Sequence, residues 1–494
     1  MAHTKKTGLF LFHRDLRIHD NVGFLEACKQ CSHLITCFIF TPEQVGKHNS
    51  YKSENAVAFM IESLAELSKE IHLAGGELCL FYGKTNTILK DLVKTHKIDA
   101  VFFNRDYSPY AKARDESVAD LCNTMHIECI TSSDYYLYEP GSVKTGGGSY
   151  YKKFTPFYEA VLHIDVPKPQ KASAKHLACL SKCAHNSKIS VNRAIELFGG
   201  GGVPGRMVEG GRANALAMLR KGLATQVHYD ATRDFLKNQT TGLSAAIKFG
   251  CISIREIYHA FLAKYGRNFG LIRELIWREF FAHVLHNFPE VLHGPYQPKF
   301  RHISWRTGAR AAADFKAWKE GRTGFPIVDA CMRQLNNTGY MHNRGRMIVA
   351  NFLVKTLLID WRLGEQYFAQ KLTDYDPASN NGNWQGISGT GVDMKPYFRD
   401  MNPWIQSAKF DADAEFIKKW VPELADVFPR DIHKWNIVSK SLYKEENSRK
   451  NTREINVKED TNKLEKYEGI NYAKPIVDYD EQKDKMLAMY ENVI

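Results

Sequence analysis

The sequence predicts an N-terminal α/β domain with a parallel, Rossmann-like sheet, followed by an all-α domain. In residues 1–139, short apolar runs rich in β-forming residues alternate with helical patterns, which is typical of a parallel sheet covered by helices on both faces. In residues 205–494, apolar residues recur at helical spacing through most of the segment. Residues 140–204 are rich in glycine, proline and lysine and are expected to connect the two domains.

Five apolar runs are the predicted strands of the sheet. They are GLFLF (8–12), ITCFIF (35–40), ELCLFY (77–82), AVFFN (100–104) and ECITS (128–132). The clearest helical pattern between them covers residues 56–71. No G-x-G-x-x-G follows the first run, so a conventional dinucleotide fingerprint is missing and the sheet need not hold the main cofactor.

The second domain contains four clear amphipathic patterns and two segments that interrupt them. The patterns cover residues 213–223, 254–265, 271–285 and 346–361. The stretch YDPASNNGNWQG (375–386) is expected to form a loop, because Pro377 disfavours a helical residue before it and Asn-Asn-Gly tolerates a tight turn. Residues 439–468 carry mixed charge and are expected to form a solvated insertion.

Composition narrows the class of protein. With 494 residues, 44% of them hydrophobic, the chain can bury large cores. No apolar run approaches the ~20 residues that span a bilayer, and the N-terminal apolar stretch is too short for a signal peptide, so we expect an intracellular protein without a membrane segment. The 67 basic residues exceed the 55 acidic ones, which favours a polyanionic partner such as nucleic acid.

The ten cysteines do not form a metal-binding pattern in the sequence. Cys28 and Cys31 make one C-x-x-C, and no second one follows at ligand spacing. Beyond residue 183 there are two cysteines, Cys251 and Cys331, which excludes a four-cysteine iron–sulfur cluster in the C-terminal half. We therefore expect reduced, mostly buried thiols and no metal ion.

Two motifs of the helical domain combine charged and aromatic side chains. RELIWREFF places Glu274 and Arg278 four residues apart with Trp277 beside them, which predicts either an intrahelical ion pair or one wall of a cavity. MHNRGRMI adds Asn343, Arg344, Arg346 and Met347. The two acids of DYD (374–376) could pair with Arg346, so these separate segments are candidates for one site.

Motifs along nearly the whole chain resemble the photolyase/cryptochrome family, most closely the class I photolyases that repair cyclobutane pyrimidine dimers. They are HRDLRIHDN (13–21), YYKKFTPFY (150–158), TTGLS (240–244), RELIWREF (273–280), GRTGFPIVDACMRQLNNTGYMHNRGRM (321–347), DYDPASNNGNWQ (374–385), PYFRDMNPW (396–404) and KPIVDYD (474–480). The resemblance implies an α/β domain of the type that binds an antenna pigment and a helical domain that buries a folded FAD.

The resemblance also implies which residues contact FAD. They are Tyr229, Thr240, Thr241, Gly242, Leu243, Ser244, Glu274, Arg278, Asn343, Arg346, Asp374, Tyr375, Asp376 and Asn380. The TTGLS segment is expected to open a helix whose free N–H groups suit the phosphates. Asn380 is expected to face the flavin N5, where photolyases usually carry Asn and plant cryptochromes carry Asp, so this residue favours repair.

Catalysis is expected to involve electron transfer and recognition of an extruded lesion. Trp384, Trp361 and Trp305 match the tryptophan chain that reduces the flavin, although each of them alone could be a core residue. The dimer must leave the duplex to reach a buried cofactor. By resemblance, the residues that contact the lesion are Glu274, Trp277, Asn343 and Met347. Those that contact phosphates are Arg233, Arg344 and Arg399, and those that act in catalysis are Glu274 and Asn380. Relatives that repair (6-4) photoproducts carry histidines in place of Asn343 and Met347.

Three departures limit the resemblance. Gly386 stands where class I photolyases have a second tryptophan against the lesion, and the adjacent Ile387 suggests that another side chain fills this wall. Leu271 replaces a tryptophan that often contacts FAD. Tyr110 and Ala111 replace the Asn and Glu of folate-binding relatives, so the identity of any antenna chromophore stays open.

The function that follows is a carbon–carbon lyase reaction on UV-damaged DNA. Reduced FAD would pass an electron to a cyclobutane dimer, the two C–C bonds would open, and the electron would return. We expect a monomer that binds neither metal nor membrane and acts in the cytoplasm or the nucleus. The alternatives are a blue-light receptor without repair activity and a photolyase for (6-4) lesions or for single-stranded DNA.

Overall fold

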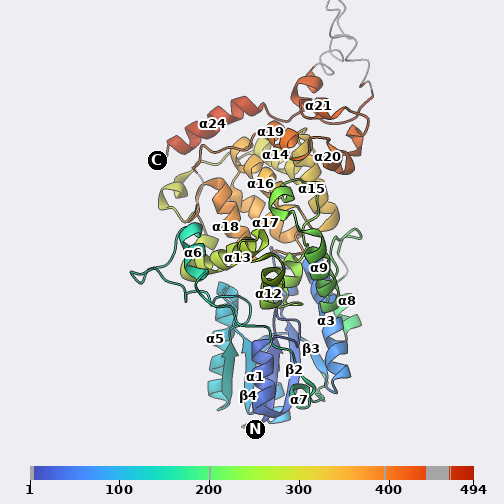
Figure 1. The fold of residues 1–494 in the computed structure, drawn as a ribbon, viewed down its shortest axis with the longest axis vertical. Coiled ribbons are helices and arrows are strands. Elements are labelled where there is room, and N and C mark those ends of the chain that lie inside the picture. The colour runs from blue at the N-terminus through green and yellow to red at the C-terminus, as the bar shows by residue number, and fades with distance from the viewer. Residues whose placement is uncertain (1–4, 200–201, 394–395, 441–466, 468, 494) are drawn as a thin grey trace, which may run out of the picture. The chain divides into compact units, whose positions relative to one another are not determined.

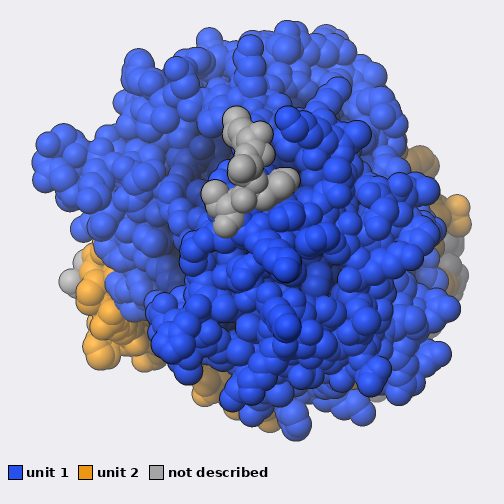
Figure 2. Space-filling view, turned by 90° about the horizontal axis from the view of Figure 1, so that it is seen from below, with its two compact units in different colours: residues 1–230, 240–294, 368–382 blue, residues 231–239, 295–367, 383–494 orange. Residues whose placement is uncertain are grey.

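The computed structural model describes residues 5–199, 202–393, 396–440, 467 and 469–493. The chain packs as two compact units (Figure 2). Unit 1 comprises Met1–Asp230, Thr240–Gly294 and Phe368–Gly382, and unit 2 comprises Ala231–Gln239, Pro295–Tyr367 and Asn383–Ile494. This division follows packing and leaves the boundaries predicted near residues 140 and 205 as predictions. Most of the predicted charged insertion, residues 439–468, lies outside the described residues.

A five-stranded parallel sheet forms the N-terminal part of unit 1 (Figure 1). Its strands are β1 (Lys5–Phe12), β2 (Cys31–Phe40), β3 (Leu78–Tyr82), β4 (Ala100–Asn104) and β5 (Glu128–Ser132). They are ordered β3-β2-β1-β4-β5, and Leu9 of the central strand pairs with Ile35 on one side and Val101 on the other. Each predicted apolar run is a strand, which confirms the α/β class.

Helices cover the sheet and bury the strand side chains. The helices that follow the strands are α1 (Val22–Gln30), α2 (Pro42–Val45), α3 (Glu54–Leu73), α4 (Thr85–His96) and α5 (Pro109–Thr124). Leu92 of α4 and Val118 of α5 belong to one buried cluster with Leu11, Cys79 and Val101 of the strands. These two helices therefore lie on the same face of the sheet, as the switch in strand order at β1 requires for right-handed connections.

The rest of unit 1 is helical. Its helices are α6 (Phe154–Val161), α7 (Ala174–Leu177), α8 (Val191–Phe198), α9 (Arg212–Thr225), α10 (Tyr229–Thr232), α11 (Ser244–Lys248), α12 (Ile254–Tyr265) and α13 (Gly270–Asn287), with the 3-10 turn η1 (Pro289–Leu292). Ser253 and Glu256 form a complete capping box at the start of α12.

Unit 2 is built from helices around a core of large aromatic residues. They are η2 (Pro298–His302), α14 (Ala309–Glu320), α15 (Pro326–Thr338), α16 (Asn343–Asn351), η3 (Phe352–Thr356), α17 (Trp361–Lys371), α19 (Pro403–Phe410), α20 (Glu415–Trp420), η4 (Pro422–Leu424), α21 (Pro429–Ile432) and α24 (Tyr479–Glu491). Trp318 and Trp435 are fully buried, and the Trp318 indole donates to the Val349 carbonyl at 3.0 Å. Among the described residues, no helix is long and apolar enough to cross a bilayer.

The loop predicted for residues 375–386 is wrong, because Pro377–Ser388 forms helix α18. Pro377 stands at the first helical position, where its missing N–H costs no hydrogen bond. A carboxylate oxygen of Asp376 accepts from the Ser379 N–H (3.0 Å), which caps the helix. A Cβ at position 382 would overlap the Phe281 ring, so Gly382 permits close approach of the chain to α13.

Candidate functional site

Arg14, at the end of β1, is the centre of a charged cluster in unit 1. Its guanidinium donates to a carboxylate oxygen of Asp376 (3.0 Å), to Asp106 (2.6 Å) and to the Tyr136 hydroxyl (3.1 Å). Burial alone would raise the pKa of Asp376, but Arg14 and Arg278 outweigh burial and lower that pKa. The second acid of DYD is therefore an ionised carboxylate, fixed at the start of α18.

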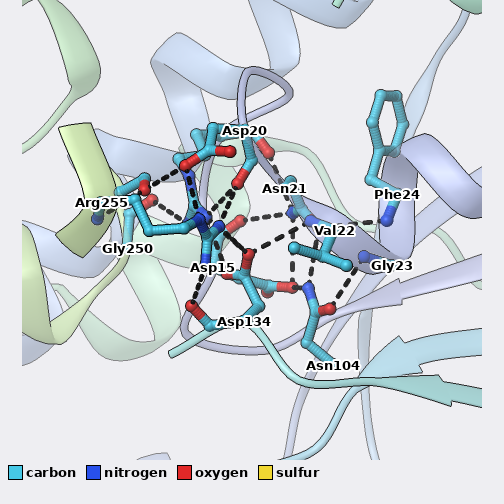
Figure 3. Close-up of polar contacts among 12 residues, drawn as sticks. Asp15, Asp20, Asn21, Val22, Gly23, Phe24, Asn104, Asp134, Gly250 and Arg255 are labelled. Carbon is cyan, nitrogen blue, oxygen red and sulfur yellow. Dashed lines mark hydrogen bonds and ion pairs between the residues drawn. The ribbon is translucent and has the colours of Figure 1, made fainter. Parts of the chain in front are cut away.

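The HRDLRIHDN motif forms a buried polar network with Asn104, Asp134 and Arg255 (Figure 3). Arg17 donates to both carboxylate oxygens of Asp134, at 2.8 and 2.7 Å, and Arg255 donates to one of them at 2.8 Å. Asn104 donates to Asp15 at 2.5 Å. Burial and the nearby Asp134 raise the pKa of Asp15 to about 6. Because buried ion pairs fix geometry more reliably than they add stability, we interpret this motif as an orienting network for the strand end.

A cavity of about 250 Å³ opens beside Arg14, at the carboxyl ends of β1 and β2. Its walls combine the apolar Leu11 and Phe38 with the charged Asp106 and Lys248. Burial lowers the pKa of Lys248 to about 8, and its ammonium lies 4.2 Å from the centre of the Phe249 ring. Carboxyl ends of parallel strands are the usual place for ligands in such sheets, so this cavity is a candidate ligand site.

The predicted phosphate-binding segment ends at the start of α11, in unit 1. The N-cap residue of this helix, Leu243, supplies no side-chain hydrogen bond, and Gly242 has a left-handed φ of +68°. The hydroxyl of Thr241 accepts from the Leu243 N–H at 3.4 Å. Since the N-cap side chain makes no hydrogen bond, the first N–H groups of the helix suit an acceptor such as a phosphate oxygen. Tyr229, also assigned to FAD, is buried in α10.

Helix α13 presents the predicted lesion wall of unit 1. The Trp277 indole stacks on Phe154, with ring centres 3.6 Å apart and planes 4° apart. Phe154 therefore covers one indole face, and Phe281 also stacks on the indole, with ring centres 5.5 Å apart and planes 28° apart. Arg278 contacts Glu279 at 3.2 Å and lies 4.3 Å above the Tyr136 ring. Glu274 is half-buried in the same helix, and its lesion contact stays a prediction.

Helix α16 carries the corresponding residues of unit 2. His342 caps the helix by accepting from the Arg344 N–H at 3.1 Å, and burial lowers the pKa of His342 to about 4, which keeps the ring neutral. Asn343 is exposed, and Met347 is half-buried. The Arg344 guanidinium pairs with Asp234 at 2.7 Å, so a DNA phosphate would have to compete with this carboxylate.

The remaining predicted contacts lie in both units. Arg346 donates to the Met341 carbonyl at 2.8 Å, and its pairing with Asp374 stays a prediction. Arg399 is exposed, whereas Arg233 is half-buried. Asn380 donates its backbone N–H to the Asp376 carbonyl at 2.9 Å, so it lies one turn into α18.

The three predicted electron-transfer tryptophans of unit 2 differ in exposure. Trp384 and Trp361 are buried at 2% and 1% exposure, whereas Trp305 is half-buried and meets the Tyr490 ring edge-on at 6.4 Å. Trp384 packs edge-to-face against Trp318, at 6.3 Å between ring centres. Two inner rings and one outer ring suit a path that ends near solvent.

The expectation that another side chain fills the lesion wall at Gly386 stays a prediction, because the structure tests it only for the first atom of a side chain. A Cβ built at this position would meet no atom within 4 Å. Two other aromatic residues of unit 2 are held by stacking on neighbouring rings. Trp404 stacks on Phe325 at 4.7 Å, and Tyr397 stacks on Tyr490 at 5.4 Å.

Comparisons with known proteins identify the family that shares this architecture. Residues 8–174 match the DNA photolyase model, and residues 271–492 match the FAD binding domain of DNA photolyase. A deoxyribodipyrimidine photo-lyase of Escherichia coli is 35% identical over 98% of each chain, and that of Synechococcus is 37% identical over 86% of this chain and 89% of the relative. The chain belongs to the photolyase/cryptochrome family.

Two solved photolyases share the fold over nearly their whole length. An archaeal photolyase from Sulfolobus tokodaii, described with two FAD molecules, has a TM-score of 0.82 at 37% identity and covers 98% of this chain and 100% of its own. A class III photolyase from Agrobacterium tumefaciens has a TM-score of 0.85 at 32% identity and covers 100% of this chain and 98% of its own. The prediction of FAD as cofactor is confirmed by the matching family model. Because a class III enzyme shares the fold with a TM-score of 0.85, the finer class I assignment remains a proposal.

In this photolyase/cryptochrome chain, sequence reasoning missed three residues of the unit 1 site. Arg14, Asp106 and Lys248 were given no role, although Arg14 lies within a recognised motif and Lys248 follows TTGLS by four residues. Their partners come from distant segments, so no local spacing could reveal them. The sequence signal that pointed to this part of the site was the HRDLR motif, which contains Arg14.

Proposed function

We propose that this protein is a light-driven DNA repair enzyme of the class I type that splits cyclobutane pyrimidine dimers. The observation that carries the proposal is the match to deoxyribodipyrimidine photo-lyases across almost the entire chain, including 98% coverage of the Escherichia coli enzyme. Asn380 supports it, because a carboxamide at this position is typical of repair enzymes. Bound and reduced FAD would supply the electron that opens the dimer and would receive it back.

The roles of the chain's own residues follow from where they are held. The ion pair from Arg14 fixes Asp376, and Asp376 caps the helix in which Asn380 stands one turn later. Asn380 is thereby held on a rigid helix, one turn after an ionised acid. The uncapped start of α11 would hold the FAD phosphates. These contacts support a preorganised cofactor site.

Lesion recognition is assigned to Glu274 and Trp277 of α13 and to Asn343 and Met347 of α16. Trp277 is braced by Phe154, which keeps its indole plane fixed for stacking on a base. The two residues of α16 are an amide and a thioether rather than histidines, which favours cyclobutane dimers over (6-4) photoproducts. The phosphate contacts proposed for Arg233, Arg344 and Arg399 would position DNA without reading its sequence.

The cavity beside Arg14 is proposed to hold a second chromophore. Its place at the strand ends, its mixed apolar and charged walls and the ammonium of Lys248 suit an aromatic ligand with anionic groups. The relative from Sulfolobus tokodaii is described with two FAD molecules. Denaturing the purified protein and separating the released pigments should yield FAD and a second chromophore. Release of one FAD per chain and no further chromophore, whether a second FAD or another pigment, would contradict this part of the proposal.

The experiment that tests the proposed function compares two lesions. Purified holoprotein is incubated with an oligonucleotide containing a cyclobutane dimer or a (6-4) photoproduct, in blue light and in darkness. We expect light-dependent repair of the cyclobutane dimer and no repair of the other lesion. Repair of the (6-4) lesion alone would mean that the substrate is the (6-4) photoproduct. A light-driven change of the flavin without repair of either lesion would favour a photoreceptor.

A further inference from the structure

The segment PYFRDMN (396–402) of unit 2 carries Arg399, the residue proposed to contact a DNA phosphate, and we call it the Arg399 loop. The Arg399 N–H donates to the Pro396 carbonyl at 2.9 Å, which closes a four-residue turn. Arg399 is exposed, and the neighbouring Phe398 is 59% exposed. Because these two side chains bury little surface, the conformation of the turn depends on contacts with neighbouring elements.

A buried lysine holds the backbone of Arg399. Lys355 is 3% exposed, and its ammonium donates to the Arg399 carbonyl. Burial of an ammonium is costly unless its N–H groups find acceptors. Lys355 lies in the π-helical turn η3, a rare geometry that often occurs at functional sites. The carbonyl of the residue that would bind the phosphate is therefore fixed by a side chain from the core of unit 2.

Two helices hold the backbone that follows Arg399. The Met401 N–H donates to the Asn351 side chain of α16 at 3.1 Å and to a carboxylate oxygen of Asp400 at 2.7 Å. The other carboxylate oxygen of Asp400 accepts from the Tyr479 hydroxyl of α24. Asp400 thus links the backbone of the Arg399 loop to the first residue of α24, and this link depends on a single hydroxyl group.

Both ends of the Arg399 loop are also anchored. The Tyr397 ring stacks on Tyr490 of α24, with ring centres 5.4 Å apart and planes 12° apart. At the other end, the Asn402 side chain caps α19 by accepting from the Trp404 N–H at 2.9 Å. Helix α24 therefore contacts the loop through Tyr479 and Tyr490, although none of the predicted site residues lies in this helix.

These anchors affect what a phosphate contact costs. A loop that becomes ordered only when DNA binds loses conformational entropy at that moment, and the loss reduces the affinity. A loop whose backbone is already fixed avoids most of this cost. Residues that fix the backbone of Arg399 can therefore raise the affinity for DNA without touching it.

On the basis of the phosphate contact proposed above for Arg399, we propose that Lys355, Asp400 and Tyr479 are positioning residues for this contact. Lys355 fixes the Arg399 carbonyl, and Tyr479 fixes the Asp400 carboxylate, which in turn holds the Met401 N–H. Helix α24 thereby takes part in DNA binding through the Arg399 loop.

The first test measures the salt dependence of binding. The holoprotein is titrated in darkness with a duplex oligonucleotide containing a cyclobutane dimer, at several salt concentrations. Arg399→Ala should lower the slope of log affinity against log salt by about one. Tyr479→Phe removes only the hydroxyl, and it should weaken binding by about three- to tenfold and also lower the slope.

Tyr467→Phe is the matched control for the loss of a hydroxyl. The Tyr467 hydroxyl donates to a carboxylate oxygen of Asp431 at 2.6 Å, so the substitution removes the same kind of hydrogen bond elsewhere in unit 2. Its affinity and salt slope should equal those of the wild type. Wild-type affinity and slope in Tyr479→Phe, or an equal loss in Tyr467→Phe, would overturn the positioning role.

The second test uses double variants. If Tyr479 acts through Arg399, Tyr479→Phe combined with Arg399→Ala should bind DNA as Arg399→Ala alone does. Lys355→Met should lower the slope in the same way and should also add nothing to Arg399→Ala. Additive losses would show that these residues act independently of Arg399 and would overturn the proposal. If Lys355→Met does not retain FAD, the result for Tyr479→Phe decides.

The binding measurements separate this proposal from the proposed function. Binding in darkness does not depend on repair, so a protein that gives the expected slopes but repairs no dimer would contradict the repair function alone. An unchanged salt slope in Arg399→Ala would remove the phosphate contact and with it the positioning role, even in a protein that repairs the dimer in light.

Discussion

Replacement of Gly364 by Ala tests whether the packing around Trp384 supports electron transfer. Gly364 is buried in α17, and a Cβ there would lie 2.6 Å from both Cζ3 of Trp384 and Cδ2 of Leu353, with Cη2 of the indole closer still. Trp384 is 2% exposed and packs against Trp318, so it has little room to move away. The added methyl group must therefore displace the indole or shift α17.

The expected loss of stability in Gly364→Ala is the balance of two opposing effects. Overpacking a core typically costs about 1–3 kcal/mol, and replacing a helical glycine by alanine returns about 0.5–1 kcal/mol. We expect Gly364→Ala to lower the free energy of unfolding by about 1–2 kcal/mol, measured by urea denaturation. The rate of flavin photoreduction with a thiol donor should also fall, towards the value of Trp384→Phe, because the first ring of the proposed path has moved.

Gly386→Ala is the matched control for stability. It adds the same methyl group to helix α18, where a Cβ meets no atom within 4 Å. The free energy of unfolding should therefore be unchanged or higher by about 1 kcal/mol. Wild-type stability and photoreduction in Gly364→Ala would refute the reasoning, since the space assigned to the Trp384 ring would then be free. Equal destabilisation by both substitutions would point to a general intolerance of alanine instead.

Three further predictions concern pH, DNA binding and the lesion wall. Burial raises the pKa of Glu279 to about 7, so the wild type loses stability as the pH rises from about 4.5 to 7. Over this pH range, the free energy of unfolding of Glu279→Gln, measured in urea, should rise by about 3 kcal/mol relative to that of the wild type. A difference between the two proteins that stays constant with pH would contradict this. Arg344→Ala should weaken damaged-DNA binding about equally in all flanking sequences and lower the salt slope by about one; a sequence-dependent loss would assign Arg344 to base reading. Gly386→Trp should tighten cyclobutane-dimer binding by about ten- to a hundredfold without affecting undamaged DNA, because the space beside Gly386 is open; weaker binding would show that the indole clashes.

The sheet could be predicted from the sequence because its signals are local. Each strand is a short apolar run of β-forming residues between polar segments, and helical patterns separate the runs. Helix α18 could not be predicted in this way. Pro377 and Asn-Asn-Gly read as a turn, but Pro377 occupies the first helical position and Asp376 caps the helix. Because Arg14 fixes the Asp376 carboxylate, residues that would otherwise predict a turn form the start of a helix.

The candidate site was predictable where the residues form ordered motifs and not where distant segments meet. The buried Trp384 and the exposed Asn343 were both found by resemblance. Asp106 and Lys248 were not, since their relation to Arg14 exists only after the strand ends and α11 pack together.

The central claim is tested most directly by one optical measurement. Holoprotein whose flavin has been chemically reduced is mixed with a thymine-dimer oligonucleotide, and ultraviolet base absorbance is recorded in blue light and in darkness. Opening of the cyclobutane ring restores two conjugated pyrimidines, so we predict a rise of absorbance in light and none in darkness. Unchanged absorbance in light, with the flavin shown to be reduced and the DNA bound, would contradict the assignment of this protein as a cyclobutane-dimer photolyase.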